Sequence, residues 1–291
     1  MNKIDYLIKI IIMPKRAINL AKCHYENLAS SHKHLPWLLV LFVFVNVFAL
    51  SISSILPEGG SSFGVSAVKQ AKAEGNDDGT VLLIHSDSTD GSVVFADDST
   101  AGNGGAGHTI TAVGNVHHEV DQKKFGATSM YFDGSGDYLS VPDSEDWDFG
   151  GGDFTIDFWV RRATVASHAY FYNQYKAGYD GVYLVAYALS HGKKLVFNVD
   201  NDGSFPWAIS LLSTTTIEAG VWYHVAVSRE GNVWRLFVNG VKEAEATNSL
   251  VLTDKTSNIG LGIGAWDFSS NPYYGHMDEM RVSKGVARWT S

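Results

Sequence analysis

The chain has 291 residues and a formal net charge of -9. This acidic balance argues against nucleic-acid binding, because a phosphate-binding protein needs a concentrated positive face. Its one cysteine, Cys23, excludes an intramolecular disulfide, so the fold must depend on a hydrophobic core or on a metal ion. The 29 glycines, the 6 prolines and the many aromatic residues favour short strands joined by tight turns.

The first segment, residues 1–34, is predicted to be a basic tail on the cytoplasmic side of a membrane. Its acidic residues are Asp5 and Glu26, and its basic residues are Lys3, Lys9, Lys15, Arg16, Lys22 and Lys33. The interleaved isoleucines and lysines fit a helix lying on the inner membrane surface, and they fit a solvated tail equally well.

The next segment, residues 35–56, reads "LPWLLVLFVFVNVFALSISSIL" and is predicted to be a transmembrane helix or signal-anchor. At a rise of about 1.5 Å per residue it can cross a hydrocarbon core of about 30 Å. The positive-inside rule then places the C-terminal bulk outside the membrane, in an extracellular or periplasmic position. Small-residue cleavage sites end at Ala49, Ala67 and Ala73, and cleavage would release the same domain. We expect a retained anchor, followed by a flexible Gly/Ser-rich linker over residues 57–79.

From residue 80 onward the pattern predicts an all-β domain. In "DFTIDFWVRR" the residues Phe154, Ile156, Phe158 and Val160 alternate onto one face, and Trp159 falls on the other. The pair Asn239-Gly240 is typical of a type I′ hairpin turn. Strands at regular intervals, without a helix-period segment, predict an antiparallel two-sheet sandwich or jelly roll over residues 80–291.

Four blocks of this domain carry a family resemblance: "LLIHSDSTDGSVVFADDS", "KKFGATSMYFDGSGDYLSVPDSEDWDFGGGDFTIDFWVR", "VWYHVAVSREGNVWRLFVNG" and "GHMDEMRVSKGVARWT". In this order they resemble the laminin-G-like, concanavalin A-like jelly-roll family, in the version found in bacterial surface proteins and phage tail proteins. The resemblance implies two antiparallel sheets, one of them concave, that bind sugars or partner proteins. It also implies a structural Ca²⁺ that ties the first strand to the last, with Asp278 as a side-chain ligand.

Aspartates in glycine-rich turns offer further oxygen ligands for Ca²⁺. The candidates are Asp87 and Asp90 in "HSDSTDG" and Asp133 and Asp137 in "FDGSGD". The alternative is that these side chains accept hydrogen bonds from backbone amides of their own turns.

The last predicted strand, "GHMDEMRVSK", carries two adjacent carboxylates, Asp278 and Glu279. Strict alternation places His276, Asp278, Met280 and Val282 on the core face and Met277, Glu279 and Arg281 on the outer face. Asp278 and Glu279 then point to opposite sides and cannot act together, whereas Glu279 and Arg281 can pair weakly.

Carbohydrate binding needs aromatic rings and polar groups on an open surface. The predicted ligand-binding residues are Trp159, Trp207, Trp266, Tyr273 and Tyr274. A second aromatic cluster lies in "SHAYFYNQY", with Tyr170, Tyr172 and Tyr175. The alternative for each ring is packing in the core or at the rim of the sandwich.

The sequence does not favour catalysis. Retaining glycosidases of this fold need two carboxylates about 5–5.5 Å apart, and the Glu-x-Asp-x-x-Glu or Glu-x-Asp-x-Glu pattern of the family is absent. The pair Glu119 and Asp121 lacks the second glutamate, and Glu243 and Glu245 have the wrong spacing.

The sequence therefore predicts a non-catalytic surface module for binding or adhesion, with a glycan or a surface protein as partner. The alternative is a structural subunit that assembles with copies of itself into a surface layer, a filament or a phage-like appendage. A glycoside hydrolase is the less favoured third hypothesis.

Overall fold

The computed structural model describes residues 76–175, 183–189, 192–201, 205–253, 260–266 and 270–291. The predicted basic tail, the apolar segment 35–56 and nearly all of the linker 57–79 lie outside these residues. Within the part that is described, no helix is both long and apolar enough to cross a membrane.

The described residues form strands and two short 3₁₀ turns, η1 and η2. Their bounds are β1 Thr80–Ile84, η1 Gly102–Gly105, β2 Thr111–Val113, β3 His117–Glu119, β4 Ser129–Asp133, β5 Tyr138–Val141, η2 Glu145–Trp147, β6 Phe154–Arg162, β7 Ala169–Gln174, β8 Tyr183–Ala188, β9 Lys194–Asp200, β10 Ile209–Thr216, β11 Trp222–Glu230, β12 Val233–Val238, β13 Val241–Thr247, β14 Leu261–Ile263 and β15 Tyr274–Lys284.

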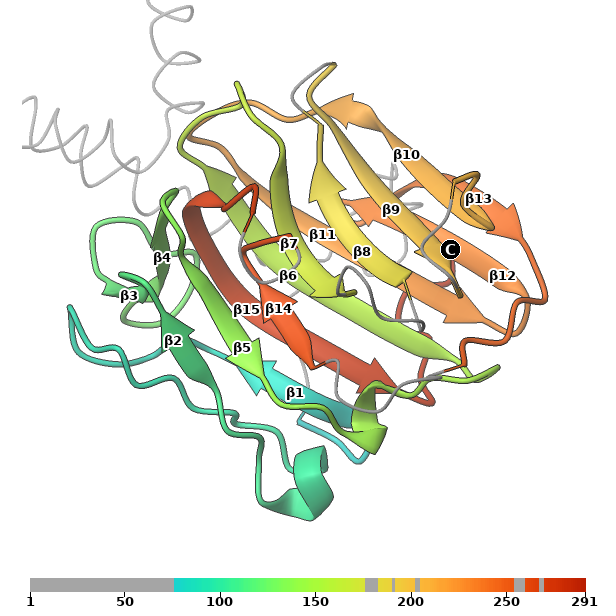
Figure 1. Ribbon diagram of the computed structural model, residues 1–291, viewed down its shortest axis with the longest axis horizontal. Coiled ribbons are helices and arrows are strands. Elements are labelled where there is room, and N and C mark those ends of the chain that lie inside the picture. Colours follow the sequence, from blue (N-terminus) through green and yellow to red (C-terminus); the bar gives the residue numbers. More distant parts are fainter. Residues whose placement is uncertain (1–75, 176–182, 190–191, 202–204, 254–259, 267–269) are drawn as a thin grey trace, which may run out of the picture. The chain divides into compact units, whose positions relative to one another are not determined.

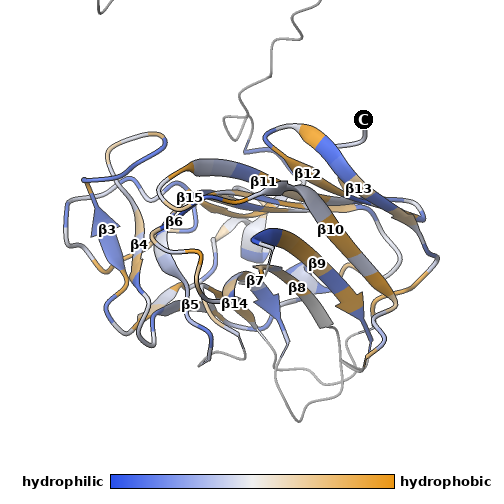
Figure 2. Ribbon diagram, turned by 90° about the horizontal axis from the view of Figure 1, so that it is seen from above, coloured by the Kyte–Doolittle hydropathy of each residue, from blue (hydrophilic) through white to orange (hydrophobic). Residues whose placement is uncertain are grey.

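Two antiparallel sheets make up this part of the chain. Sheet A has the order β13-β12-β11-β6-β15-β4-β3, and β1 also pairs with β15. Sheet B has the order β10-β9-β8-β7-β14-β5-β2. Figure 1 shows β7, β8 and β9 of sheet B in front of β6, β11 and β15 of sheet A, and Figure 2 shows the two sheets as separate layers. The predicted all-β, two-sheet antiparallel sandwich is confirmed.

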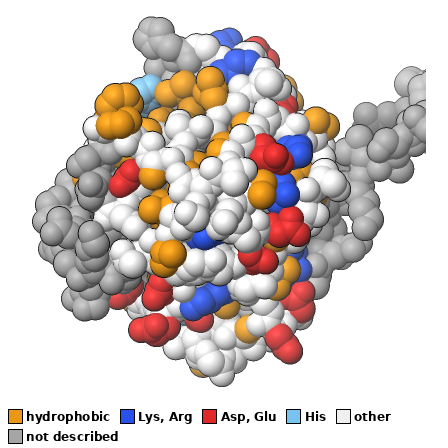
Figure 3. All heavy atoms as spheres, turned by 90° about the vertical axis from the view of Figure 1, so that its right-hand side faces the viewer, with side chains coloured by type: hydrophobic (Ala, Val, Ile, Leu, Met, Phe, Trp, Pro, Cys, Tyr) orange, Lys and Arg blue, Asp and Glu red, His pale blue; other side chains and the backbone are white. Residues whose placement is uncertain are grey.

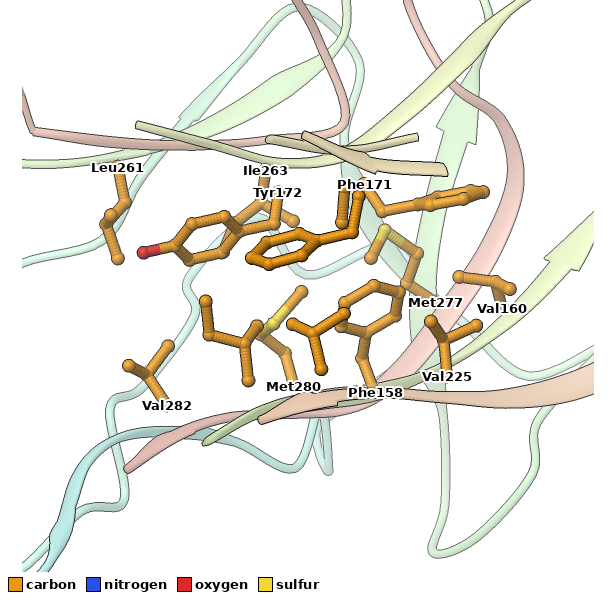
Figure 4. Close-up of a cluster of buried hydrophobic side chains, with 14 of the residues drawn as sticks. Phe158, Val160, Phe171, Tyr172, Val225, Leu261, Ile263, Met277, Met280 and Val282 are labelled. Atoms are coloured by element: carbon orange, nitrogen blue, oxygen red, sulfur yellow. The ribbon is translucent and has the colours of Figure 1, made fainter. Parts of the chain in front are cut away.

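The core lies between the sheets. From sheet A, the predicted face of β6 points inward with Phe158 and Val160, next to Met280 of β15. From sheet B, Phe171 and Ile263 meet them in the same layer (Figure 4). The hairpin between β12 and β13 has the predicted Asn239-Gly240 turn, with φ of 50° and 80° at the two residues.

The last strand departs from strict alternation. Its register shifts between Asp278 and Arg281, and Glu279 has a φ of 51°. Such a bulge inserts one residue and moves the side chains beyond it to the other face. As a result Met277 and Met280 both reach the core, whereas Asp278 pairs with Trp159 on the outer face of sheet A. The prediction that His276 and Asp278 share the core face with Met280 and Val282 is wrong, because both pair with outward-facing residues of β6. The prediction that Met277 faces outward is wrong as well.

Candidate functional site

The outer face of sheet B carries two parallel cross-strand rows. In the first row Tyr170 of β7 pairs with Tyr187 of β8, which pairs with Val196 of β9. In the second row Asn173 pairs with Val185, which pairs with Asn198. These side chains point away from the core because their neighbours Ala186, Phe197 and Val199 belong to the core cluster. We call Asn173, Val185 and Asn198 the asparagine row.

Aromatic rings pack around this row. The rings of Tyr170 and Tyr187 stack with centroids 4.9 Å apart, and Trp266 lies 5.0 Å from Tyr170 and 4.9 Å from Tyr175. Trp207 joins the same cluster, with Val185 in its middle. We call these five rings, Tyr170, Tyr175, Tyr187, Trp207 and Trp266, the aromatic layer.

The aromatic layer is held by local structure. Trp266 forms a two-bond backbone bridge with Ser270, at 2.8 and 2.9 Å. Asp200, at the end of β9, accepts hydrogen bonds from the backbone N–H groups of Asn201 and Ala208, and this positions the turn that carries Trp207. Phe205, in the same turn, is 83 % exposed and packs edge-on against Trp207. The turn therefore extends the aromatic surface toward solvent.

The two asparagines differ from most buried polar side chains in how their donor and acceptor atoms are used. Asn173 Nδ2 donates to the backbone oxygen of Tyr175 at 2.9 Å, and Asn198 Nδ2 donates to the Tyr187 hydroxyl at 3.1 Å. The Oδ1 atoms of both residues are buried and have no hydrogen-bond partner within the described part of the chain. A buried acceptor without a partner costs about 1–3 kcal/mol. An asparagine pair of this kind is expected to be satisfied by a ligand or by water.

The site is uncharged at its centre. Burial raises the pKa of Tyr170 to about 12, and it also raises the pKa of Tyr187. Both hydroxyls therefore stay protonated at neutral pH. The face offers rings, hydroxyls and amide oxygens, which is the chemistry that recognises sugars.

The predicted ligand-binding residues are divided among three places. Trp207 and Trp266 belong to the aromatic layer. Trp159 is on the outer face of sheet A but only 6 % exposed, because Lys124 lies 4.1 Å above its ring and Phe125 packs on its edge. Tyr273 is fully buried between Phe132 and Phe171. Neither Trp159 nor Tyr273 is exposed on an open surface in this structure, and their role in binding stays a prediction.

Tyr274, the last predicted ligand-binding residue, is 41 % exposed and pairs with Asp133 across β15 and β4. It belongs to sheet A, outside the aromatic layer, and its role in binding stays a prediction. Tyr170 and Tyr175 of the second sequence cluster do reach the face of sheet B, whereas Tyr172 lies in the core. Sequence reasoning missed Asn173 and Asn198. The signal was the presence of an asparagine in each of two mostly apolar strands, β7 and β9.

The predicted metal ligands are occupied by backbone amides. Asp278 Oδ2 accepts from the N–H groups of Lys124 and Phe125, at 2.8 and 3.0 Å, and its Oδ1 accepts from Glu279. Asp87 accepts from Ala127 and Asp90 from Val120, so three carboxylates hold one segment, residues 120–127. Asp133 accepts from Ser135 and from the side chain of Asn115, and Asp137 accepts from the N–H groups of Asn115 and Asp133.

This donor set does not fit a cation at Asp278, because N–H groups place positive charge where Ca²⁺ would sit. Among the residues that the structure describes, no group of three or more His, Cys, Asp or Glu side chains is arranged to hold a metal. Calcium stays a prediction from the family resemblance.

Charges are interspersed on the side of the domain that carries β10 and β13. Figure 3 shows basic and acidic side chains next to each other there, with hydrophobic side chains gathered at one edge. Leu212 of β10 and Val241 of β13 are among the exposed hydrophobic residues. Among the described residues in this view, basic side chains are interspersed with acidic ones and form no concentrated positive face for phosphates.

The two antiparallel layers and the aromatic outer face define a lectin-like sandwich. A laminin G family model, described as the concanavalin A-like lectin/glucanases superfamily, matches residues 133–290. The chain belongs to this family. No curated protein is similar enough in sequence to match the chain.

Solved structures show the same fold at low sequence identity. Domain 4 of AbnA, a GH43 extracellular arabinanase from Geobacillus stearothermophilus, has a TM-score of 0.53 and 19% identity, covering 72% of this chain and 93% of that one. The binding domain of Paraclostridial Mosquitocidal Protein 1 has a TM-score of 0.52 and 17% identity, covering 71% and 49%. The Botulinum neurotoxin serotype D binding domain has a TM-score of 0.52 and 12% identity, covering 72% and 49%. The matched region thus spans about half of each of these two binding domains.

Proposed function

We propose that this chain is a non-catalytic glycan-binding module and that the outer face of sheet B is its binding surface. The observation that carries the proposal is the asparagine row beneath the aromatic layer, whose two buried acceptors have no hydrogen-bond partner among the described residues. Sugars present a ring face for stacking and hydroxyl groups for hydrogen bonding, so they complement both features.

Two structural neighbours support a sugar as ligand. The arabinanase domain 4 was solved in complex with arabinotriose. The binding domain of Botulinum Neurotoxin DC, with a TM-score of 0.51 and 13% identity, was solved in complex with SialylT. These likenesses concern the fold, and the choice of binding face rests on the residues of this chain.

A binding role without catalysis is supported by the hydrogen bonds of Asp200, an acidic residue at the site. Asp200 carries a carboxylate on this face, and both of its oxygens accept backbone N–H groups. Retaining hydrolysis needs two carboxylates placed on either side of the scissile bond. Asp200 is instead used to hold the Trp207 turn.

The experiment is a glycan array probed with the purified full-length chain in a detergent that has no sugar headgroup. We expect retained glycans, without release of reducing sugar. Trp266→Ala and Tyr187→Ala should each weaken binding about tenfold, whereas Tyr274→Ala on sheet A should leave it unchanged. No bound glycan, together with self-assembly of the chain in solution, would favour the structural-subunit alternative.

The location of the module is a separate proposal that rests on the sequence alone. The basic residues before the apolar segment 35–56 support an anchored protein with the jelly-roll domain outside the membrane. Added protease should then digest the domain on cells whose inner membrane is intact but whose outer layers have been removed. Protection of the domain until the inner membrane is lysed would contradict this orientation.

A further inference from the structure

Arg162 is a buried cation at the end of β6. The inward face of this strand runs through Phe158 and Val160, and alternation continues this face to Arg162. The Arg162 side chain is 1 % exposed, and its Nη2 donates to the backbone oxygen of Ser167, which lies between β6 and β7. The guanidinium therefore lies inside the sandwich, at the corner where the chain passes from sheet A to sheet B.

Two nitrogen atoms of this guanidinium lack a partner. Nε and Nη1 of Arg162 are buried and form no hydrogen bond within the described part of the chain. The nearby hydroxyl of Tyr273 already donates to the His276 oxygen and accepts from the Arg161 backbone N–H. Burial also raises the pKa of Tyr273, so its hydroxyl is uncharged at neutral pH and does not balance the charge of the guanidinium.

Other buried arginines of the domain show how such a group is normally satisfied. Arg281 forms two hydrogen bonds with the carboxylate of Asp157. Arg229 donates through Nε and Nη1 to backbone oxygens and lies 4.6 Å from the ring of Trp234. Among the described residues Arg162 has neither a carboxylate partner nor acceptors for these same two atoms.

The charge of Arg162 determines what can satisfy it. A guanidinium keeps its proton in proteins, so the buried side chain carries a full positive charge. A buried charge without a partner is strongly unfavourable. Water would accept the N–H groups and leave the charge unbalanced, whereas an anion accepts them and balances the charge. Because Arg162 carries one charge and is almost fully buried, such an anion must be monovalent and small.

We infer that Arg162 binds a small monovalent inorganic anion, of the size of chloride, inside the sandwich at the corner between β6 and β7. The ion accepts a hydrogen bond from an N–H group of Arg162 that has no partner among the described residues, and it balances the charge of the guanidinium. Core residues next to the corner are small, since Ala169 of β7 pairs with Ala188 of β8. Arg162 faces the core rather than the aromatic layer, so this inference is independent of glycan binding.

The first test follows the melting midpoint of the full-length chain against chloride concentration. In a nonionic detergent, sodium chloride replaces the sodium salt of a bulky organic sulfonate at constant ionic strength, so the screening of surface charges does not change. A ligand that binds only the folded chain raises the midpoint. We expect a rise of about 5–10 °C when chloride reaches a hundredfold excess over its dissociation constant, and bromide should act in the same way.

The second test removes the charge. Arg162→Met keeps most of the apolar stem, and without chloride it should melt at or above the midpoint of the unmodified chain, because an unpaired buried charge has been removed. Its midpoint should not respond to chloride. Arg161→Met is the matched control, because it removes the same charge from the adjacent residue, which faces the opposite side of sheet A. This variant should keep the full response to chloride.

Crystals of the full-length chain soaked in sodium bromide give a result that does not depend on whether Arg162→Met folds. We expect an anomalous scattering peak within hydrogen-bonding distance of the Arg162 guanidinium. Water at these nitrogen atoms, with bromide only at the protein surface, would overturn the inference. A midpoint that does not depend on chloride would overturn it as well, and so would an equal response of the unmodified chain and Arg162→Met.

Discussion

At the scale of single residues, Asp278 shows how burial and hydrogen bonding oppose each other. Burial raises the pKa of Asp278 to about 7, although three backbone N–H groups favour its charged form. A carboxyl whose pKa is higher in the folded than in the unfolded chain binds its proton more tightly when folded. Its contribution to the free energy of unfolding is therefore complete below about pH 4, which is near the pKa of an aspartate in the unfolded chain. This contribution is lost as pH rises through about 7.

The raised pKa of Asp278 gives a prediction for the variant Asp278→Asn. The uncharged variant lacks that titration, so the free energy of unfolding of the unmodified chain should fall relative to the variant between pH 5 and pH 8. The difference should amount to a few kcal/mol, at about 1.4 kcal/mol per unit of pKa shift. Urea unfolding at several pH values measures it. Parallel pH profiles for the two proteins would contradict it.

A second residue-scale prediction concerns Arg281, which sequence reasoning paired weakly with Glu279. The structure pairs it instead with Asp157 through two hydrogen bonds of 2.8 and 2.6 Å, both residues being buried, while Glu279 contacts His85. Arg281→Met would leave a buried carboxylate without its cation, and it should lower the free energy of unfolding by about 3–5 kcal/mol. Adding Asp157→Asn should recover part of the loss in urea unfolding. A double variant less stable than Arg281→Met would show that the charge is not the cause.

At the scale of elements, the sequence predicted most strands and missed two bulges. The alternation of β6 and the Asn239-Gly240 turn could be read directly, because hydrophobic period and turn chemistry are local. The bulge in β7, between Tyr170 and Tyr172, sends Tyr172 into the core, and the bulge in β15 moves Asp278 outward. The shifts occur in the pairing of β7 with β8 and of β15 with β6, so the alternation within one strand does not reveal them.

The candidate site could also be predicted only in part from the sequence. Trp207 and Trp266 could be chosen because loop aromatics are often functional. Trp159 could not be excluded from the sequence, because the segment 120–127 that covers it is distant in the chain. The asparagine row becomes visible only when β8 is placed between β7 and β9.

The C-terminal segment after β15 gives an element-scale prediction. Its residues lie on the outer face of sheet A, where Thr155 donates to the Val286 oxygen and Arg288 forms two hydrogen bonds with Asp77. Trp289 packs on His224 and Phe237. Deleting residues 286–291 should lower the free energy of unfolding by about 2–4 kcal/mol, as expected for losing a partly buried tryptophan and the hydrogen bonds of its neighbours. Deleting only residues 290–291 should change it little, and an equal effect of both deletions would contradict this account.

At the scale of the whole domain, stability must come from contacts other than disulfides, since Cys23 is the only cysteine. The main hydrophobic cluster draws residues from both sheets. The start and the end of the domain are joined by the β1–β15 pairing and by the Asp77–Arg288 contact, which helps to lower the pKa of Asp77 to about 2. These contacts tie the first strand to the last, which is the role that the family resemblance assigned to a calcium ion.

Metal removal tests whether the carboxylates near β1 and β15 act through amides or through an ion. Asp87 follows β1, Asp278 lies in β15, and both accept backbone N–H groups of the segment 120–127. If these bonds hold the segment, EDTA should leave the melting midpoint of the full-length chain unchanged, and added Ca²⁺ should not raise it. A calcium ion bound only by the folded chain would raise the midpoint with increasing concentration, because binding shifts the folding equilibrium. Such a rise, lost in Asp278→Asn, would show that Asp278 exchanges its amide partners for the cation.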